Sequence, residues 1–218
     1  MKINNRIISG ESKPYIIAEM SANHNGNIEN AYKIIDMAKA AGADAVKLQT
    51  YRPDTITMDI HTHEFMIEGG LWNGKNLYEL YDSTFMPWEW HKPLFDYAKK
   101  IDITIFSSPF DNTAVDFLED LNVPAYKIAS FEAVDLPLIR YVAQTGKPMI
   151  ISTGMADLNE IQEAIEVAQE GGCKELAILH CVSGYPALAE EYNLRTLVNM
   201  QQHFGVVVGL SDHTIDNI

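Results

Sequence analysis

Cysteine is scarce in this sequence: its 218 residues include two, Cys173 and Cys181, whose spacing fits neither a metal-binding nor a redox Cys-x-x-Cys motif. A disulfide framework is therefore not expected. The sequence also lacks any run of about eighteen apolar residues, and Met1 to Gly10 contain no apolar segment of a secretory signal. We therefore expect a cytoplasmic protein with no membrane partner.

Basic residues are also few, since 16 Lys and Arg stand against 30 Asp and Glu, which gives a formal net charge of −14. No block of basic residues occurs, so we expect no nucleic-acid partner. What the sequence does contain is 47% hydrophobic residues. That fraction is enough to bury a core, and it predicts one globular domain.

Apolar runs of strand length alternate with amphipathic helical patterns, which is typical of repeated βα units and a parallel sheet. The predicted strands are Tyr15–Met20, Ala45–Thr50, Thr104–Pro109, Ala125–Ser130, Pro148–Thr153, Glu175–Cys181 and Val206–Ser211. The predicted helices are Ile28–Ala41, Trp88–Lys100, Asn112–Leu121, Leu136–Gln144, Leu158–Gly171 and Leu194–Phe204. Asp157 and Glu160 fit a capping box for one of these helices. Tyr51–Pro87 is predicted to be a long functional loop.

Polar side chains gather where these strands end, which favours a (β/α)8 TIM barrel, because its chemistry lies at the carboxyl ends of its strands. A doubly wound sheet is the alternative, but it usually carries a Gly-rich first turn, and none occurs here. Seven strands do not close such a barrel. We therefore expect residues 1–218 to be an incomplete TIM-barrel catalytic domain whose last strand and helices follow Ile218.

Lysines near the ends of two predicted strands, Lys47 and Lys127, indicate a receptor for a phosphate or carboxylate, because a buried ammonium favours an anionic partner. The hydroxyls of Ser108, Ser130, Ser152 and Thr153 would add donors. Gly154 would let backbone N–H groups approach the ligand. The alternative is that each lysine forms a salt bridge with Glu19 or Glu132.

Other polar and aromatic residues leave two interpretations open. His213 could ligate a divalent metal or act as an acid or base, and His24 and His180 are similar candidates, although a lone histidine is more often structural. Glu19 and Glu132 could transfer protons or bind sugar hydroxyls. Trp72, Tyr78, Tyr81, Trp88 and Trp90 could line a sugar-binding mouth or fix the long loop.

Several motifs resemble the sialic acid synthase family over nearly the whole sequence. They are Ile-Ile-Ala-Glu-Met-Ser-Ala-Asn-His-Asn-Gly (16–26), Ala-Gly-Ala-Asp-Ala-Val-Lys-Leu-Gln-Thr (41–50), Ser-Ser-Pro-Phe-Asp (107–111), Tyr-Lys-Ile-Ala-Ser (126–130), Ser-Thr-Gly-Met (152–155) and Gly-Leu-Ser-Asp-His-Thr (209–214). Enzymes of this family condense phosphoenolpyruvate with an acetamido sugar. The resemblance implies that both substrates are partners of this protein.

The resemblance also implies roles for individual residues. Phosphoenolpyruvate would be surrounded by Lys47, Ser108, Lys127, Ser130, Ser152, Thr153, Gly154, Ser183 and Ser211. The acceptor sugar would face Glu19, Gln49, Glu132 and Tyr185, and His213 would bind a divalent metal, commonly Mn²⁺, with Mg²⁺ or Co²⁺ as alternatives. The family's other metal-binding histidine and its C-terminal antifreeze-like domain are expected after Ile218, so residues 1–218 alone are predicted to be inactive, and the full-length protein is expected to be a homodimer.

Within the family, several segments are most similar to the branch that makes pseudaminic acid from a 2,4-diacetamido-2,4,6-trideoxy hexose. These are Gly70-Leu71-Trp72, Leu77–Tyr81, Glu89-Trp90-His91, Ser130–Ala133 and Asn193-Leu194-Arg195. Ser183 stands where N-acetylneuraminate synthases carry asparagine. The alternatives are N-acetylneuraminate or legionaminic acid synthesis, a Schiff-base aldolase that uses Lys127, and a fragment that only binds sugar phosphates.

Overall fold

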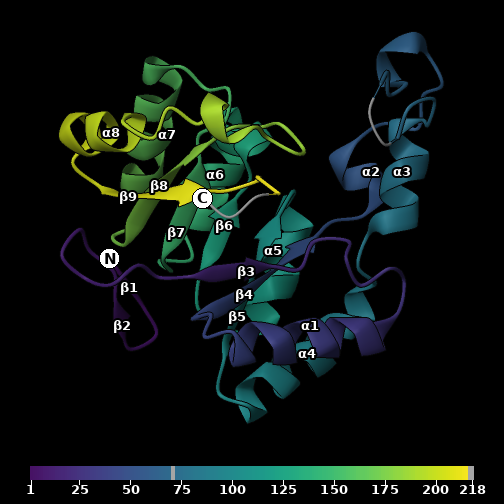
Figure 1. The fold of residues 1–218 in the computed structure, drawn as a ribbon, viewed down its shortest axis with the longest axis horizontal. Helices are drawn as coiled ribbons and strands as arrows, with labels where there is room; N and C mark the ends of the chain where they lie inside the picture. Colours follow the sequence, from purple (N-terminus) through teal and green to yellow (C-terminus); the bar gives the residue numbers. More distant parts are fainter. Residues whose placement is uncertain (70–71, 216–218) are drawn as a thin grey trace. The chain divides into compact units, whose positions relative to one another are not determined.

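The computed structural model describes residues 1–69 and 72–215, so Gly70 and Leu71 of the Gly70-Leu71-Trp72 motif lie outside the described residues. The chain forms two compact units (Figure 1). One unit is Tyr15–Val123, and the other joins Met1–Pro14 to the residues from Pro124 onward.

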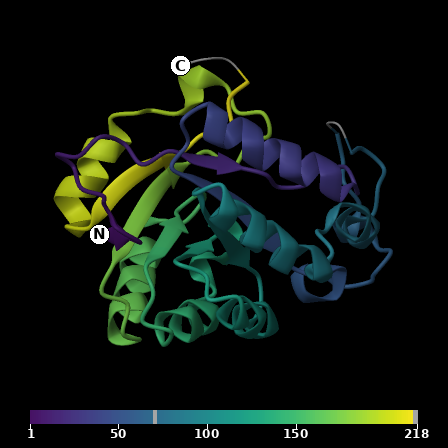
Figure 2. The ribbon, with the colours of Figure 1, turned by 90° about the horizontal axis from the view of Figure 1, so that it is seen from below.

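The unit Tyr15–Val123 contains parallel strands, each followed by helical structure. Its strands are β3 (Ile17–Glu19), β4 (Ala45–Thr50) and β5 (Thr104–Pro109), and its long helices are α1 (Ile28–Ala40), α4 (Trp88–Lys100) and α5 (Asn112–Asp120). Helices α1 and α4 lie side by side (Figures 1 and 2), with Ile35 and Leu94 fully buried against the sheet residue Leu48. This apolar core fixes the strands whose ends carry the polar residues.

The predicted loop Tyr51–Pro87 is in part helical, which corrects the expectation of a long loop. It contains α2 (Pro53–Ile56), the 3₁₀ turn η1 (His63–Phe65) and α3 (Leu77–Thr84). Asn76 caps α3 by accepting a hydrogen bond from the Tyr78 N–H, and Leu80 is buried. Helix α3 has only 8 residues. One capping asparagine and one buried leucine were therefore too little to predict this helix from the sequence.

The second unit has its own parallel strands and a small N-terminal hairpin. The hairpin is β1 (Lys2–Ile3) with β2 (Arg6–Ile7), and the parallel strands are β6 (Tyr126–Ile128), β7 (Met149–Ser152), β8 (Leu176–Cys181) and β9 (Val207–Ser211). The helices are α6 (Leu136–Ala143), α7 (Leu158–Glu170) and α8 (Thr196–Phe204), with 3₁₀ turns η2 (Ser130–Val134) and η3 (Ala189–Glu191). In the described parts of the chain, no helix is long and apolar enough to cross a membrane.

The predicted strands and helices are confirmed as β3 to β9 and as α1 and α4 to α8, and the capping box of Asp157 and Glu160 is present at α7. The strand predicted at Ala125–Ser130 is shorter than expected. It ends at Ile128, because Ser130 already begins the turn η2. The hairpin β1–β2 was not predicted, since strands of 2 residues carry no readable alternation.

Candidate functional site

The first polar group lies at the ends of β3, β4 and β5, and we call Glu19, Lys47, Gln49 and Ser108 the Lys47 cluster. The Lys47 ammonium forms an ion pair with Glu19 and lies 3.4 Å from Ser108 Oγ. Ser21 links the others, because its N–H donates to Glu19 Oε1 at 3.0 Å and its hydroxyl donates to Gln49 Oε1 at 3.2 Å. Parallel pairing of Glu19 with Lys47 and of Gln49 with Ser108 explains why these side chains meet. For Lys47, the salt bridge considered as an alternative is therefore present.

The second polar group lies at the ends of β6, β7 and β8 in the other unit, and we call Lys127, Ser130, Ser152, Gly154 and Ser183 the Lys127 cluster. Lys127 is 5% exposed, and its ammonium donates to Ser152 Oγ at 2.6 Å and to the Ile128 carbonyl at 3.1 Å. The hydroxyls of Ser130 and Ser183 are 3.2 Å apart. Hydroxyls and a buried positive charge together favour an oxyanion ligand.

Gly154 allows this close approach. Its φ is +50°, and a Cβ at this position would lie 2.5 Å from Ser130 Cβ and 3.0 Å from Ser183 Oγ. Any other residue would push these two serines apart. The neighbouring Thr153 donates its hydroxyl to the Leu179 carbonyl at 3.1 Å, so its proton is already used to bind the adjacent strand.

Glu132, in η2, is a partly buried residue whose carboxyl pKa is raised to about 7. Burial is the main cause, and the positive charge of Lys127 acts in the opposite direction. Its Oε2 atom is buried without a hydrogen-bond partner among the described residues. Near neutral pH this carboxyl can therefore both hold and release a proton.

His213 follows β9 and contacts the end of β8. Its Nδ1 lies 2.9 Å from the Val182 carbonyl, and because a carbonyl only accepts, Nδ1 carries a proton. In the neutral ring Nε2 then keeps its lone pair, which is the arrangement found in metal-binding histidines. The Tyr185 ring packs against the imidazole at 4.4 Å between centroids, and Ser211 Oγ lies 3.5 Å from Nε2.

Cys181 also belongs to this corner, and it was missed in the sequence because its spacing matches no motif. Its Sγ lies 4.0 Å from His213 Nδ1. This hydrogen bond is the main cause that raises the pKa of His213. Burial raises the pKa of the Cys181 thiol, but its hydrogen bonds, the largest from His213, outweigh burial and leave the pKa below the usual value.

A divalent metal fits only in part here. His213 has the donor chemistry of one ligand, but residues 1–69 and 72–215 contain no group of three or more His, Cys, Asp or Glu side chains that could hold a metal ion. The other two candidate histidines each use one ring nitrogen in a local hydrogen bond, and Nε2 of His24 is buried without a hydrogen-bond partner among the described residues. His24 Nδ1 accepts the Gly26 N–H at 3.1 Å, and His180 Nε2 donates to the Tyr192 carbonyl at 2.5 Å.

Of the five candidate aromatics, Trp88 and Tyr81 contact other rings, Tyr81 packing against Tyr51, whereas Trp72 is 42% exposed. Trp88 stacks on Phe117 at 4.7 Å, its Nε1 donates to the Tyr51 carbonyl at 3.2 Å, and the Arg52 guanidinium lies 4.2 Å from its ring centroid. For Trp88, these contacts favour the alternative in which the aromatic residue fixes the segment.

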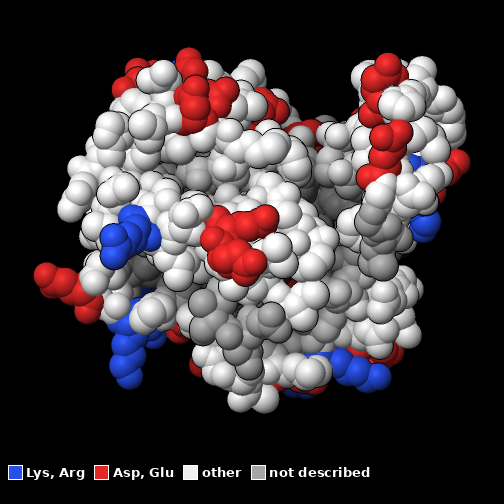
Figure 3. Space-filling model, turned by 45° about the horizontal axis from the view of Figure 1, so that its top comes forward, with Lys and Arg blue, Asp and Glu red and all other residues white. Residues whose placement is uncertain are grey.

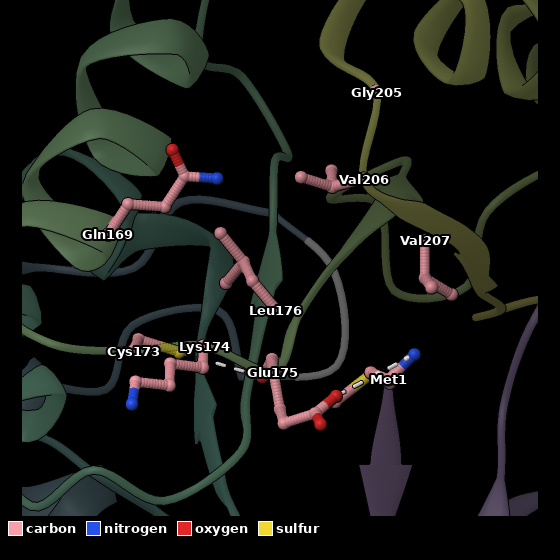
Figure 4. Close-up of a pocket in the computed structure, with 9 residues that line it drawn as sticks. All are labelled: Met1, Gln169, Cys173, Lys174, Glu175, Leu176, Gly205, Val206 and Val207. Atoms are coloured by element: carbon pink, nitrogen blue, oxygen red, sulfur yellow. Dashed lines mark hydrogen bonds and ion pairs between the residues drawn. The ribbon is translucent and has the colours of Figure 1, made fainter.

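On the described residues, acidic charge is scattered over the surface (Figure 3), and one cavity lies away from the polar strand ends. Acidic side chains form several separate groups on the face drawn in Figure 3, in keeping with the negative net charge. A cavity of about 250 Å³ lies at the beginnings of β8 and β9 and is lined by Met1, Cys173 and Glu175 among others (Figure 4). None of its lining residues is a predicted site residue, because those residues follow the opposite ends of the strands.

Residues 34–218 match the NeuB family. The chain belongs to the NeuB family. Among its NeuB relatives, the pseudaminic acid synthase of Helicobacter pylori is 48% identical over 205 residues, which cover 94% of this chain and 60% of that protein. The N,N'-diacetyllegionaminic acid synthase of Campylobacter jejuni is 36% identical over 205 residues, covering 93% of this chain and 61% of the relative.

A solved structure of a sialic acid synthetase is also similar to this chain. The crystal structure of N-acetylneuraminic acid synthetase from Leptospira borgpetersenii, in complex with citrate, matches with a TM-score of 0.87 and 27% identity over 98% of this chain and 70% of that chain. The chain spans about three fifths of the length of the two curated relatives. The resemblance to the sialic acid synthase family is thereby confirmed.

We predict that Glu132→Gln stabilises the protein at pH 8 but not at pH 4. The folded pKa of about 7 lies above the ordinary 4.5, so the stability that comes from the protonated form is present below pH 4.5 and is lost as pH rises towards 7. Glutamine stays neutral, so the gain in the free energy of unfolding at pH 8 should be on the order of 3 kcal/mol. Urea unfolding at both pH values measures it.

The matched control is Glu163→Gln, which changes an exposed carboxylate of α7. It should leave the stability difference between pH 4 and pH 8 as in the wild type. Equal effects of the two substitutions at both pH values would contradict a raised pKa at Glu132.

Proposed function

We propose that the chain is the phosphoenolpyruvate-binding part of a pseudaminic acid synthase, which condenses phosphoenolpyruvate with a 2,4-diacetamido-2,4,6-trideoxy hexose. The observation that carries this proposal is the greater similarity to the Helicobacter pylori pseudaminic acid synthase than to the legionaminic acid synthase. We further propose that the parallel βα units of the chain belong to a (β/α)8 barrel, since polar side chains follow the carboxyl ends of the strands in each unit.

The proposed reaction forms one carbon–carbon bond and breaks one carbon–oxygen bond. C3 of phosphoenolpyruvate attacks the aldehyde carbon of the open-chain sugar, whose oxygen takes up a proton to become a hydroxyl. Water adds at C2 and loses a proton, and the tetrahedral carbon collapses to a ketone as the bond between C2 and the phosphate oxygen breaks and inorganic phosphate leaves. The ammonium groups of Lys47 and Lys127 stabilise the phosphate charge as it leaves. The hydroxyls of Ser108, Ser130, Ser152, Ser183 and Ser211 donate hydrogen bonds to phosphoenolpyruvate.

Glu132 is a better candidate than Glu19 for proton transfer in this reaction. The Glu19 carboxylate is held by the Lys47 ammonium, whereas Glu132 has a pKa of about 7 and a buried oxygen without a partner among the described residues. A carboxyl with a pKa near the working pH can donate a proton and take it back. Gln49 and Tyr185, which is 60% exposed, would contact the acceptor sugar.

A divalent metal, Mn²⁺ in our proposal, would supply Lewis acidity at the sugar aldehyde. Nε2 of His213 would be one ligand, because the Val182 carbonyl fixes the proton on Nδ1. The Tyr185 ring packed on the imidazole would hold the ring in this orientation.

The acceptor sugar is the direct test of this function. We expect the whole protein to release phosphate from phosphoenolpyruvate with 2,4-diacetamido-2,4,6-trideoxyaltrose, and at least about tenfold more slowly with N-acetylmannosamine at equal concentration, since a single well-fitted contact is worth that much discrimination. A phosphate-release assay with both sugars measures the ratio. A preference for N-acetylmannosamine would instead support N-acetylneuraminate synthesis.

Lys127→Met should reduce kcat by at least about 10³-fold, because it removes a buried positive charge from the proposed phosphate site while keeping an unbranched side chain. Lys174→Met, at an exposed position before β8, is the control and should retain wild-type activity. Borohydride treatment in the presence of substrate distinguishes the synthase from the alternative Schiff-base aldolase. Covalent attachment of substrate at Lys127 would establish the aldolase and contradict the synthase mechanism.

His213→Ala should weaken Mn²⁺ binding to the whole protein by about 10- to 100-fold or more, as loss of an imidazole ligand or of its support does in other metal sites. Titration followed by the electron paramagnetic resonance of free Mn²⁺ measures this without requiring turnover. His203→Ala, an exposed histidine in the last turn of α8, is the control. Unchanged binding in His213→Ala would exclude this residue as a ligand.

A further inference from the structure

A buried hydrogen-bond chain lies in the unit Tyr15–Val123, and none of the roles above uses it. Its members are Thr50, His91 and Ser107, each 0% exposed. Thr50 Oγ1 lies 2.8 Å from His91 Nε2 and 2.6 Å from Ser107 Oγ. On the other side of the imidazole, Nδ1 lies 3.3 Å from the Pro87 carbonyl.

One arrangement of protons satisfies every member of this chain. The Pro87 carbonyl only accepts, so Nδ1 of His91 carries a proton. Burial lowers the pKa of His91 to about 4, so the ring is neutral and Nε2 accepts. Thr50 must then donate to Nε2, and the Thr50 oxygen accepts from the Ser107 hydroxyl.

The hydrogen-bond chain of Thr50, His91 and Ser107 lies directly behind the Lys47 cluster. Side chains alternate along a strand, so Lys47 and Gln49 point to one face of β4, and Leu48 and Thr50 point to the other. In β5, Ser108 faces the Lys47 cluster while Ser107 turns towards Thr50. Thr50 and Ser107 therefore join the ends of the two strands from the back, each one residue away from a group of the cluster.

His91 extends the chain to the end of the long segment that connects β4 to α4. The Pro87 carbonyl that it binds precedes α4, and Trp88 in the next position donates to the Tyr51 carbonyl just after β4. Hydrogen bonds therefore hold both ends of the segment Tyr51–Pro87 close to the ends of β4 and β5.

We propose that His91 is a positioning residue that acts through Thr50 and Ser107 to hold the ends of β4 and β5, so that Gln49 and Ser108 are kept in place for substrate. This inference rests on the proposed function, in which Ser108 binds phosphoenolpyruvate and Gln49 faces the acceptor. A buried hydroxyl that loses its partner must find another, and the strand end that carries it shifts.

Two substitutions of Thr50 in the whole protein separate the hydroxyl from the shape of the side chain. Thr50→Val keeps the shape and loses the hydroxyl, whereas Thr50→Ser keeps the hydroxyl and loses a methyl group. We expect Thr50→Val to raise the KM for phosphoenolpyruvate about 10- to 100-fold with a smaller change in kcat, because ground-state contacts are misplaced, while Thr50→Ser stays within about threefold of wild type. Thr145→Val, which removes a partly buried hydroxyl that donates to the Val142 carbonyl in the other unit, is the control and should leave KM unchanged.

Each outcome decides a separate point. A wild-type KM in Thr50→Val, or a larger effect in Thr50→Ser, would overturn the positioning role and leave the proposed function standing. Absence of phosphoenolpyruvate turnover in the wild type would overturn the proposed function and this role together. Nitrogen-15 NMR of the His91 ring at pH 7 tests the chain itself: a proton on Nδ1 supports it, and a proton on Nε2 overturns it.

Discussion

The burial of the Lys127 ammonium is the constraint on which the Lys127 cluster depends. A positive charge that is 5% exposed must be surrounded by oxygens, because an isolated buried charge costs many kcal/mol. The unit supplies the Ser152 hydroxyl from the neighbouring strand and the Ile128 carbonyl from the end of β6 itself. Strand β6 stops at Ile128, and its last carbonyl can therefore turn to the ammonium rather than continue the ladder.

Burial also sets the acid–base behaviour of the Glu132 carboxyl, which follows in η2. Burial raises the pKa of Glu132 to about 7, and the charge of Lys127 only partly offsets this effect. Lys47 has the opposite surroundings, since its partner Glu19 has a side chain that is 42% exposed and is held in an ion pair. The two lysines thus differ in kind: Lys47 is balanced by a carboxylate, and Lys127 donates to a hydroxyl and a carbonyl near a carboxyl that is partly protonated at neutral pH.

The parts of the fold that follow from local pattern could be predicted from the sequence. Buried parallel strands such as Ala45–Thr50 read as apolar runs, and Asp157 with Glu160 marks the beginning of α7. The length of β6, the helix α3 and the raised pKa of Glu132 could not be predicted in this way, because each depends on what packs against the residue from elsewhere in the chain. The ion pair of Lys47 with Glu19 was predicted only as the alternative to an anionic ligand. Glu19 comes from another strand, so its distance from Lys47 depends on the tertiary structure.

Alternation along a strand gives each strand end two separate functions, and this explains why no role for His91 could be predicted from the sequence. On β4, Gln49 points to the face that carries the Lys47 cluster, and its residue type is part of a recognisable motif. Its neighbour Thr50 points to the other face, towards helix α4, and in the sequence it resembles an ordinary core position. A buried histidine on α4 carries no sign of its partner until β4 and β5 are paired. The residues on the two faces of a strand end, such as Thr50 and Gln49, should therefore be considered together. Because they share one backbone, a shift of one residue moves the other.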